Sequence, residues 1–173
     1  MTHEAENKVL IPCPLEKAAI GRAYPLVRNI APSVTLEQWQ RFAQPKIGPC
    51  SPTRRRGLMS IQNPSGYILG LFGFEIRDEL GDGPTLCMHN IIVPNVPGRG
   101  AIWASIAGVA ETLAKDNGCG AVRADVADDL DLTDTDRAWV VACLEKSGYA
   151  IEGIRAVKRI APAIKASPRP KPL

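Results

Sequence analysis

Three apolar runs joined by short turns lead directly into a helical pattern, and this succession restricts the folds open to the chain. The runs cover residues 58–62, 67–75 and 86–93. The turns between them, 63–66 and 81–84, are rich in glycine and proline. Connections this short join antiparallel strands, because a parallel crossover needs a dozen or more residues. The middle run is apolar on both of its faces, which predicts a central strand.

The helical pattern begins at residue 100 and ends near Gly118. One stripe of this helix carries Ile102, Ile106, Val109 and Leu113. The other predicted elements are a strand at 8–13, helices at 18–30 and 36–44, a strand at 121–126, a helix at 133–147 and a strand at 149–160. Thr35 and Gln38 have the spacing of a capping box, and Pro25 is expected to kink its helix or to start a new one.

The element order is therefore β-α-α-β-β-β-α-β-α-β. It predicts an α/β (α+β) fold with a mixed, mainly antiparallel central sheet of about six strands, flanked by about four helices. One domain is expected over residues 8–160, with flexible termini at 1–7 and 161–173. No β-rich segment follows the predicted strand at 149–160, which leaves a sheet edge that a second subunit could cover, so a homodimer is possible.

Composition narrows the class of protein. The chain has 173 residues, of which 45% are hydrophobic and 23% charged, and a formal net charge of +3. This charge makes a nucleic-acid partner unlikely on electrostatic grounds, and no apolar run approaches the roughly 20 residues of a membrane span. The five cysteines are odd in number and lack CxxC spacing. They predict free thiols in a reducing compartment, no metal site, and a cytoplasmic location.

The segment from 91 to 102 carries the clearest chemical signal. An apolar strand passes through a turn containing Gly98 and Gly100 and continues straight into the amphipathic helix. Glycine allows backbone N–H groups to approach a ligand, and a helix N-terminus adds unpaired donors, so the turn suits a phosphate or pyrophosphate. A merely tight connection explains the same glycines. A P-loop is excluded by the missing Gly-Lys-Ser/Thr, and Trp103 stands where a dinucleotide fingerprint has its third glycine.

The chain resembles the GNAT N-acyltransferases in element order and in two short motifs. The first is the Val-x-Pro-like strand exit followed by Gly98-Arg99-Gly100, and the second is the segment 144–149, LEKSGY. The resemblance implies acetyl-CoA or another acyl-CoA as co-substrate and a small-molecule or peptide amine as acceptor. It also implies that CoA is bound by Ile91, Ile92, Val93, Val96, Gly98, Arg99, Gly100 and Ala101.

This sequence departs from the family pattern at several positions. Asn95 stands where the family prefers Gln or Arg, and Pro97 stands where Arg is common in the family. Pro97 also cannot donate a backbone hydrogen bond. Leu144 occupies the position where many members place a tyrosine as general acid toward the CoA thiolate. Tyr149 takes the place of a phenylalanine and is expected to pack in the core with its hydroxyl at an edge. Another group or water must then supply the proton, or the chain no longer catalyses.

His89 is the candidate general base, because it lies four residues before Val93 and has an ordinary pKa of about 6.5. A packed histidine without a role is the alternative. Glu75 is the second catalytic candidate and Glu79 a reserve. Cys87 would share a face with His89, but no third residue orients such a pair.

Two charge clusters leave alternatives open. The arginines at 54–56 could bind nucleic acid or the CoA 3′-phosphate, or could simply be solvated. Six aspartates between Asp125 and Asp136 could attract a cationic amine or could cap a helix. The sequence thus predicts an N-acyltransferase acting by direct attack of an amine, or alternatively a non-catalytic acyl-CoA-binding or regulatory relative. An acetylating toxin or nucleic-acid modifier would need a more basic surface.

Overall fold

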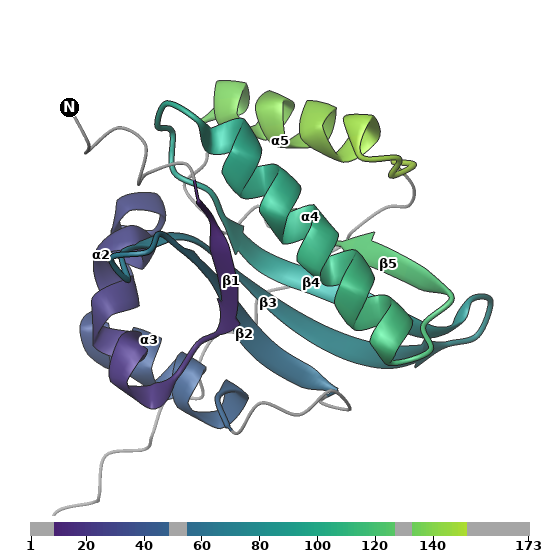
Figure 1. Ribbon diagram of the computed structural model, residues 1–173, viewed down its shortest axis with the longest axis horizontal. Helices are drawn as coiled ribbons and strands as arrows, with labels where there is room; N and C mark the ends of the chain where they lie inside the picture. Colours follow the sequence, from purple (N-terminus) through teal and green to yellow (C-terminus); the bar gives the residue numbers. More distant parts are fainter. Residues whose placement is uncertain (1–8, 49–54, 127–132, 152–173) are drawn as a thin grey trace, which may run out of the picture.

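The computed structural model describes residues 9–48, 55–126 and 133–151. Within these ranges the chain forms one five-stranded sheet in the order β1-β2-β3-β4-β5 (Figure 1). Its strands are β1 (Ile11–Pro14), β2 (Arg56–Gln62), β3 (Ile68–Glu79), β4 (Gly83–Ile92) and β5 (Ala121–Ala124). The first four strands pair antiparallel, and β5 pairs parallel with β4 because α4 forms the crossover between them.

Four α-helices and two 3₁₀ turns accompany the sheet in the described residues. The α-helices are α2 (Ile20–Ile30), α3 (Leu36–Ala43), α4 (Arg99–Asp116) and α5 (Asp134–Lys146), and the 3₁₀ turns are η1 (Lys17–Ala19) and η2 (Gln44–Lys46). The capping box at Thr35 and Gln38 is confirmed by hydrogen bonds of 3.2 and 2.8 Å. Pro25 lies inside α2. None of these helices has the length and apolar character needed to cross a membrane.

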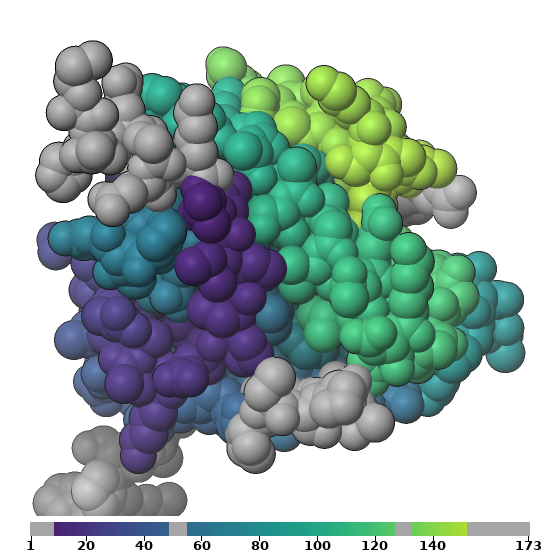
Figure 2. All heavy atoms as spheres, viewed as in Figure 1, coloured from purple at the N-terminus to yellow at the C-terminus, as the bar shows by residue number. Residues whose placement is uncertain are grey.

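The sheet carries a separate hydrophobic core on each face, because successive residues of a strand point to opposite sides. Phe72, Phe74 and Met88 pack against Ile102 and Ile106 of α4 on one face. The second core lies under α2 and α3 and contains Leu58, Leu71 and Ile92 of the sheet with Ala23, Val27 and Trp39 of the helices. Figure 2 shows α4 and α5 side by side on the surface of the first face.

The mixed, mainly antiparallel sheet and the central position of β3 are confirmed. Most of the predicted strand 149–160 lies outside the described residues, as do the predicted termini 1–7 and 161–173, which leaves five strands where about six were expected. The buried face of α4 contains Ile102 and Ile106, as predicted, but differs farther along the helix. Ala110 and Ala114 are buried on it, whereas Val109 and Leu113 are only partly buried at its side. Small side chains lie deepest here, which allows close helix–sheet packing.

Candidate functional site

The turn between β4 and α4 offers unengaged backbone donors. Gly98 is the N-cap of α4, with a φ of +83° that favours glycine, and no side chain caps the helix. Within the described residues, no hydrogen bond is made by the backbone N–H of Gly98 or Gly100. A Cβ built on either glycine would meet no atom within 4 Å. The turn is therefore open toward solvent and carries two unengaged donors at a helix N-terminus.

The other residues predicted around this turn contribute less. The Val96 N–H donates to the Pro94 carbonyl at 2.9 Å, and the Arg99 N–H donates to the Val96 carbonyl at 3.1 Å. The Ala101 N–H donates to the Gly98 carbonyl at 2.9 Å. These bonds hold the turn in shape and leave the two glycine amides as its open donors, since Pro97 has no N–H.

The Arg99 side chain is directed to α5. Its guanidinium lies 3.0 Å from an Asp136 carboxylate oxygen and 4.0 Å from the centroid of the Trp139 ring. Trp103 on α4 meets Trp139 edge to face at 6.4 Å, and its Nε1 donates to Ser147 Oγ at 3.1 Å. Arg99 therefore joins the start of α4 to α5, whereas the sequence had predicted that it would bind CoA.

A bulge interrupts β4 just before the turn. Leu71 of β3 pairs with Ile92 and Gly73 pairs with His89, so one residue on β3 faces two on β4. Asn90 takes up the extra length with a φ of +49°, a conformation that asparagine tolerates better than most residues. Pairing of β4 with β5 reaches only Met88 in the described residues. The backbone of Ile91, Ile92 and Val93 thus lies beyond the β4–β5 ladder.

The His89 imidazole lies directly over Gly73 on the neighbouring strand. A Cβ at Gly73 would come within 2.5 Å of His89 Nδ1, so the ring occupies space that only glycine leaves free. Burial lowers the pKa of His89, and the positive charges of Lys46 and Arg77 lower it further, whereas a hydrogen bond with Asn90 and the charge of Glu75 act in the opposite direction. The imidazole is accordingly neutral at pH 7 and able to accept a proton.

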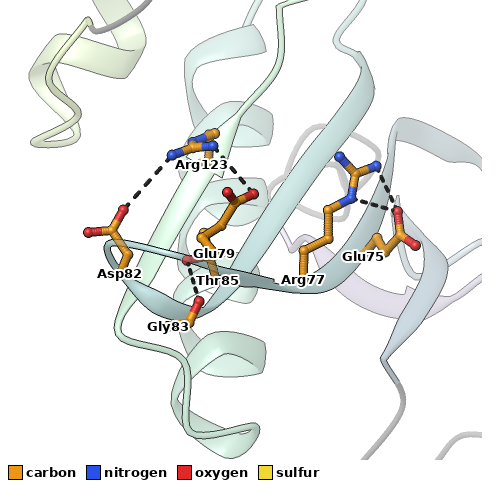
Figure 3. Close-up of polar contacts among 7 residues, drawn as sticks. All are labelled: Glu75, Arg77, Glu79, Asp82, Gly83, Thr85 and Arg123. Atoms are coloured by element: carbon orange, nitrogen blue, oxygen red, sulfur yellow. Dashed lines mark hydrogen bonds and ion pairs between the residues drawn. The ribbon is translucent and has the colours of Figure 1, made fainter.

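The candidate carboxylates belong to two arginine clusters, which Figure 3 shows separately. Arg77 donates two hydrogen bonds to one Glu75 oxygen, at 2.8 and 3.0 Å. These bonds lower the pKa of Glu75 and so reduce its strength as a base. Arg123 of β5 lies 3.5 Å from Glu79 and 3.9 Å from Asp82, measured between nitrogen and oxygen. Of the three predicted bases, His89 is the one without an arginine partner in the described residues.

The position at which a general acid was expected holds the buried, apolar side chain of Leu144. Leu144 is 3% exposed on α5. Tyr149 packs against the α4 core, as predicted, but its hydroxyl is buried and finds no hydrogen-bond partner among the described residues. Burial raises the pKa of Tyr149 to about 12. The hydroxyl is therefore not at an edge, and a group this weakly acidic is a poor proton donor.

The chain matches no sequence-family profile and no curated protein, but it is similar to many solved structures. An aminoglycoside N-acetyltransferase in complex with CoA matches with a TM-score of 0.69 and 11% identity, over 88% of this chain and 95% of the other. Glucosamine-6-phosphate N-acetyltransferase from Arabidopsis thaliana matches with a TM-score of 0.61 and 17% identity, over 88% and 99%. Ribosomal-protein-alanine N-acetyltransferase from Brucella melitensis matches with a TM-score of 0.64 and 15% identity, over 88% and 100%. The fold is the GNAT fold.

The GNAT resemblance predicted from two motifs is thus confirmed for the fold. His89 lies near the end of β4, and the glycine turn follows that strand and leads into α4. The sequence analysis did not single out two residues that shape this region, Asn90 and Gly73. An asparagine after the candidate histidine and a glycine inside an apolar strand were the available signals, because both residue types mark bulges or close approaches in strands.

The remaining predictions concern the arginines at 54–56, the aspartates at 125–136 and the cysteines. Arg55 pairs with Asp78, whereas Arg56 begins β2 opposite Glu75, and Arg54 lies outside the described residues. Thr133 and Asp136 cap α5, which accounts for one of the six aspartates, and the positions 128, 129 and 131 are not described. Cys13, Cys87, Cys119 and Cys143 are free thiols, and no cluster of metal-ligating side chains occurs in the described parts of the chain.

Proposed function

We propose that this protein is an N-acyltransferase that transfers an acetyl or other acyl group from acyl-CoA to an amine by direct attack. The single observation that carries the proposal is the open turn at Gly98 and Gly100, which follows the end of β4, where the strand has passed the β4–β5 ladder and carries His89. The GNAT fold supports it, since an aminoglycoside N-acetyltransferase with this fold is known in complex with CoA and with a CoA bisubstrate analogue.

The residues present suit a CoA pyrophosphate and the chain attached to it. The two glycine amides and the α4 N-terminus would hold the pyrophosphate, because they are unengaged and no Cβ occupies the space. The backbone of Ile91, Ile92 and Val93, beyond the β4–β5 ladder, would hydrogen-bond the pantetheine arm as a strand would. The bulge at Asn90 interrupts the β3–β4 ladder, and its backbone groups would be available to the acyl group.

His89 would accept the proton that the amine loses. A neutral imidazole at pH 7 is the protonation state that this role requires, and burial keeps it so. Glu75 is paired with Arg77, so we assign it an electrostatic role, in which its negative charge raises the pKa of His89. The new C–N bond forms as the C–S bond of the thioester breaks, and CoA leaves as the thiolate, which then takes up a proton.

A non-catalytic acyl-CoA-binding protein is the second candidate, and Leu144 favours it. The described residues place no phenol at the position where related enzymes hold a general acid. A thiolate leaving group can be protonated by water, because its own pKa is near 8–9. The two candidates therefore differ in turnover and agree in binding acyl-CoA.

The donor site is tested with Gly100→Val, which places a branched side chain in the open turn. Acetyl-CoA should raise the Tm of the wild-type protein, since a ligand at 100 times its Kd stabilises by about 2.7 kcal/mol. Gly100→Val should lose this shift. Gly108→Val is the matched control, because Gly108 lies in the same helix with equally open space around its Cβ position. Equal acetyl-CoA binding by both variants would refute the assignment of the turn.

Catalysis is tested with His89→Gln, which preserves polarity but cannot accept a proton near neutrality. Turnover on an amine panel should fall by roughly 10²-fold while acetyl-CoA affinity stays within a few-fold. A wild-type protein that binds acetyl-CoA and acylates no amine would instead support the non-catalytic candidate.

A further inference from the structure

The sheet face that carries His89 also carries a group of basic residues. Cross-strand partners share a face, and Arg56 of β2 is the partner of Glu75, whereas His89 of β4 is the partner of Gly73. Glu75 and Gly73 are two residues apart on β3 and therefore point the same way. We call the surface formed by Lys46, Arg56, Glu75, Arg77 and His89 the His89 face.

Alternation along the strands places the His89 face on the side opposite α4. Leu58, two residues after Arg56, lies in the core under α2 and α3, as does Leu71, two residues before Gly73. These helices cover only that end of the face. Beyond them, Arg56 and Arg77 are exposed and His89 is half-buried. The face is thus accessible next to the proposed base.

Three cations and the carboxylate of Glu75 belong to this face, and the charge of Asp125 also acts on Arg77. Burial lowers the pKa of Lys46, and the charge of Arg56 lowers it further. Burial is likewise the largest cause of the lowered pKa of His89, to which the charges of Lys46 and Arg77 add. The carboxylate of Glu75 receives two hydrogen bonds from Arg77. The Lys46 ammonium donates to the Phe42 carbonyl at 3.2 Å and lies 3.5 Å from the centroid of the Phe42 ring, which fixes its position on η2.

Arg56 has a different environment from its neighbours in sequence and in space. Within the described residues, no hydrogen bond or ion pair holds its exposed guanidinium, and its interactions are with the charges of Lys46 and Glu75. Arg55 is tied to Asp78 at 3.1 Å. Arg123, farther along the sheet, is flanked by Glu79 and Asp82 and leaves that end acidic (Figure 3). Positive charge is therefore concentrated at the η2–β2 side of His89.

We propose that the amine acceptor carries an anionic group, a carboxylate or a phosphate, that binds Arg56 and Lys46 while its amine lies at His89. This inference rests on the proposed function and names its substrate class. Two strand spacings and two residues of rise separate the Cα atoms of Arg56 and His89 by about 12 Å. The amine and the anion of such an acceptor are therefore several ångströms apart.

The group-transfer step remains balanced with such an acceptor. The amine nitrogen bonds to the acyl carbon as the C–S bond breaks, His89 takes the amine proton, and the CoA thiolate acquires a proton from solvent. The anionic group keeps its charge throughout and takes no part in bond making. It raises the occupancy of the acceptor in the correct orientation, so its effect falls mainly on KM.

Matched acceptor pairs test the inference through release of the CoA thiol. One pair is glucosamine 6-phosphate and glucosamine, and the other is a dipeptide with a free C-terminal carboxylate and the same dipeptide amide. The anionic member of at least one pair should have a kcat/KM at least tenfold higher, and the pair that responds distinguishes phosphate from carboxylate. Arg56→Gln should lower this ratio about tenfold. Arg55→Gln is the matched control and should retain it, because Arg55 pairs with Asp78.

Binding provides a second readout. The chain has only two histidines, so the His89 ring signal in an NMR spectrum can be followed as the anionic acceptor is added in the presence of CoA. It should shift in the wild type and in Arg55→Gln, at about tenfold lower acceptor concentration than in Arg56→Gln. Equal or better transfer to the neutral members would overturn the inference and leave the proposed function intact. Transfer to no amine at all would overturn both.

Discussion

Gly73→Ala tests the contact on which the position of His89 depends. The added methyl carbon would lie 2.5 Å from His89 Nδ1, well inside the ~3.5 Å at which non-bonded heavy atoms attract. Keeping the ring in place would cost about 1–3 kcal/mol as overpacking. The ring is half-buried at the edge of an accessible face, so rotating it into solvent is the less costly response.

The net change in stability is small, and the titration of His89 is the more informative measurement. Alanine recovers about 0.4–1 kcal/mol through the unfolded state, which leaves a net loss of at most about 2.6 kcal/mol. Burial is the largest cause of the lowered pKa of His89. A displaced ring should therefore titrate at a higher pKa, closer to its ordinary value of about 6.5.

The assay is an NMR pH titration of the His89 ring, with urea melts to confirm folding. Gly70→Ala is the control on the same strand, because its new methyl would lie 2.6 Å from Ile102 Cγ2, in the core under α4. It should destabilise the protein and leave the pKa of His89 unchanged. A folded Gly73→Ala protein with a wild-type His89 titration would refute the assigned position of the imidazole.

Four further predictions concern stability. A double-mutant cycle of Arg99→Ala and Asp136→Asn should give a coupling of about 0.5–1 kcal/mol in urea melts, and additive effects would contradict the pair. Tyr149→Phe should be neutral or stabilising by up to about 1 kcal/mol, since it removes a buried hydroxyl without a partner in the described residues. A clear loss of stability would show that the hydroxyl has a hydrogen-bond partner after all. Thr35→Ala should cost about 1 kcal/mol in thermal melts by removing a helix cap. Because the folded pKa of His89 is lowered, its contribution to the free energy of unfolding should grow as pH rises from that pKa to about 6.5, and should be absent from His89→Gln.

Much of the candidate site was predictable because its signals are local. The glycines of the turn, the strand before it and the helix after it lie within about a dozen consecutive residues, and backbone geometry over such a span is set by neighbouring residue types. The capping box at Thr35 depends on a spacing of three residues. His89 was predictable from its residue type and its distance from the strand end, although its role stays a prediction.

The sequence alone determined the order of elements, the antiparallel meander and the strand-to-helix turn, since period and turn chemistry specify these within short windows. Tertiary structure decided which distant residues meet. Arg99 is directed to Asp136, 37 residues away, rather than to a ligand. The hairpin register of β3 and β4 places His89 over Gly73, and the bulge at Asn90 shifts this register only beyond His89. The separate register of β2 on β3 puts Arg56 on the same face. Strand register depends on how both faces of the sheet pack, and one segment read alone carries no information about its partner.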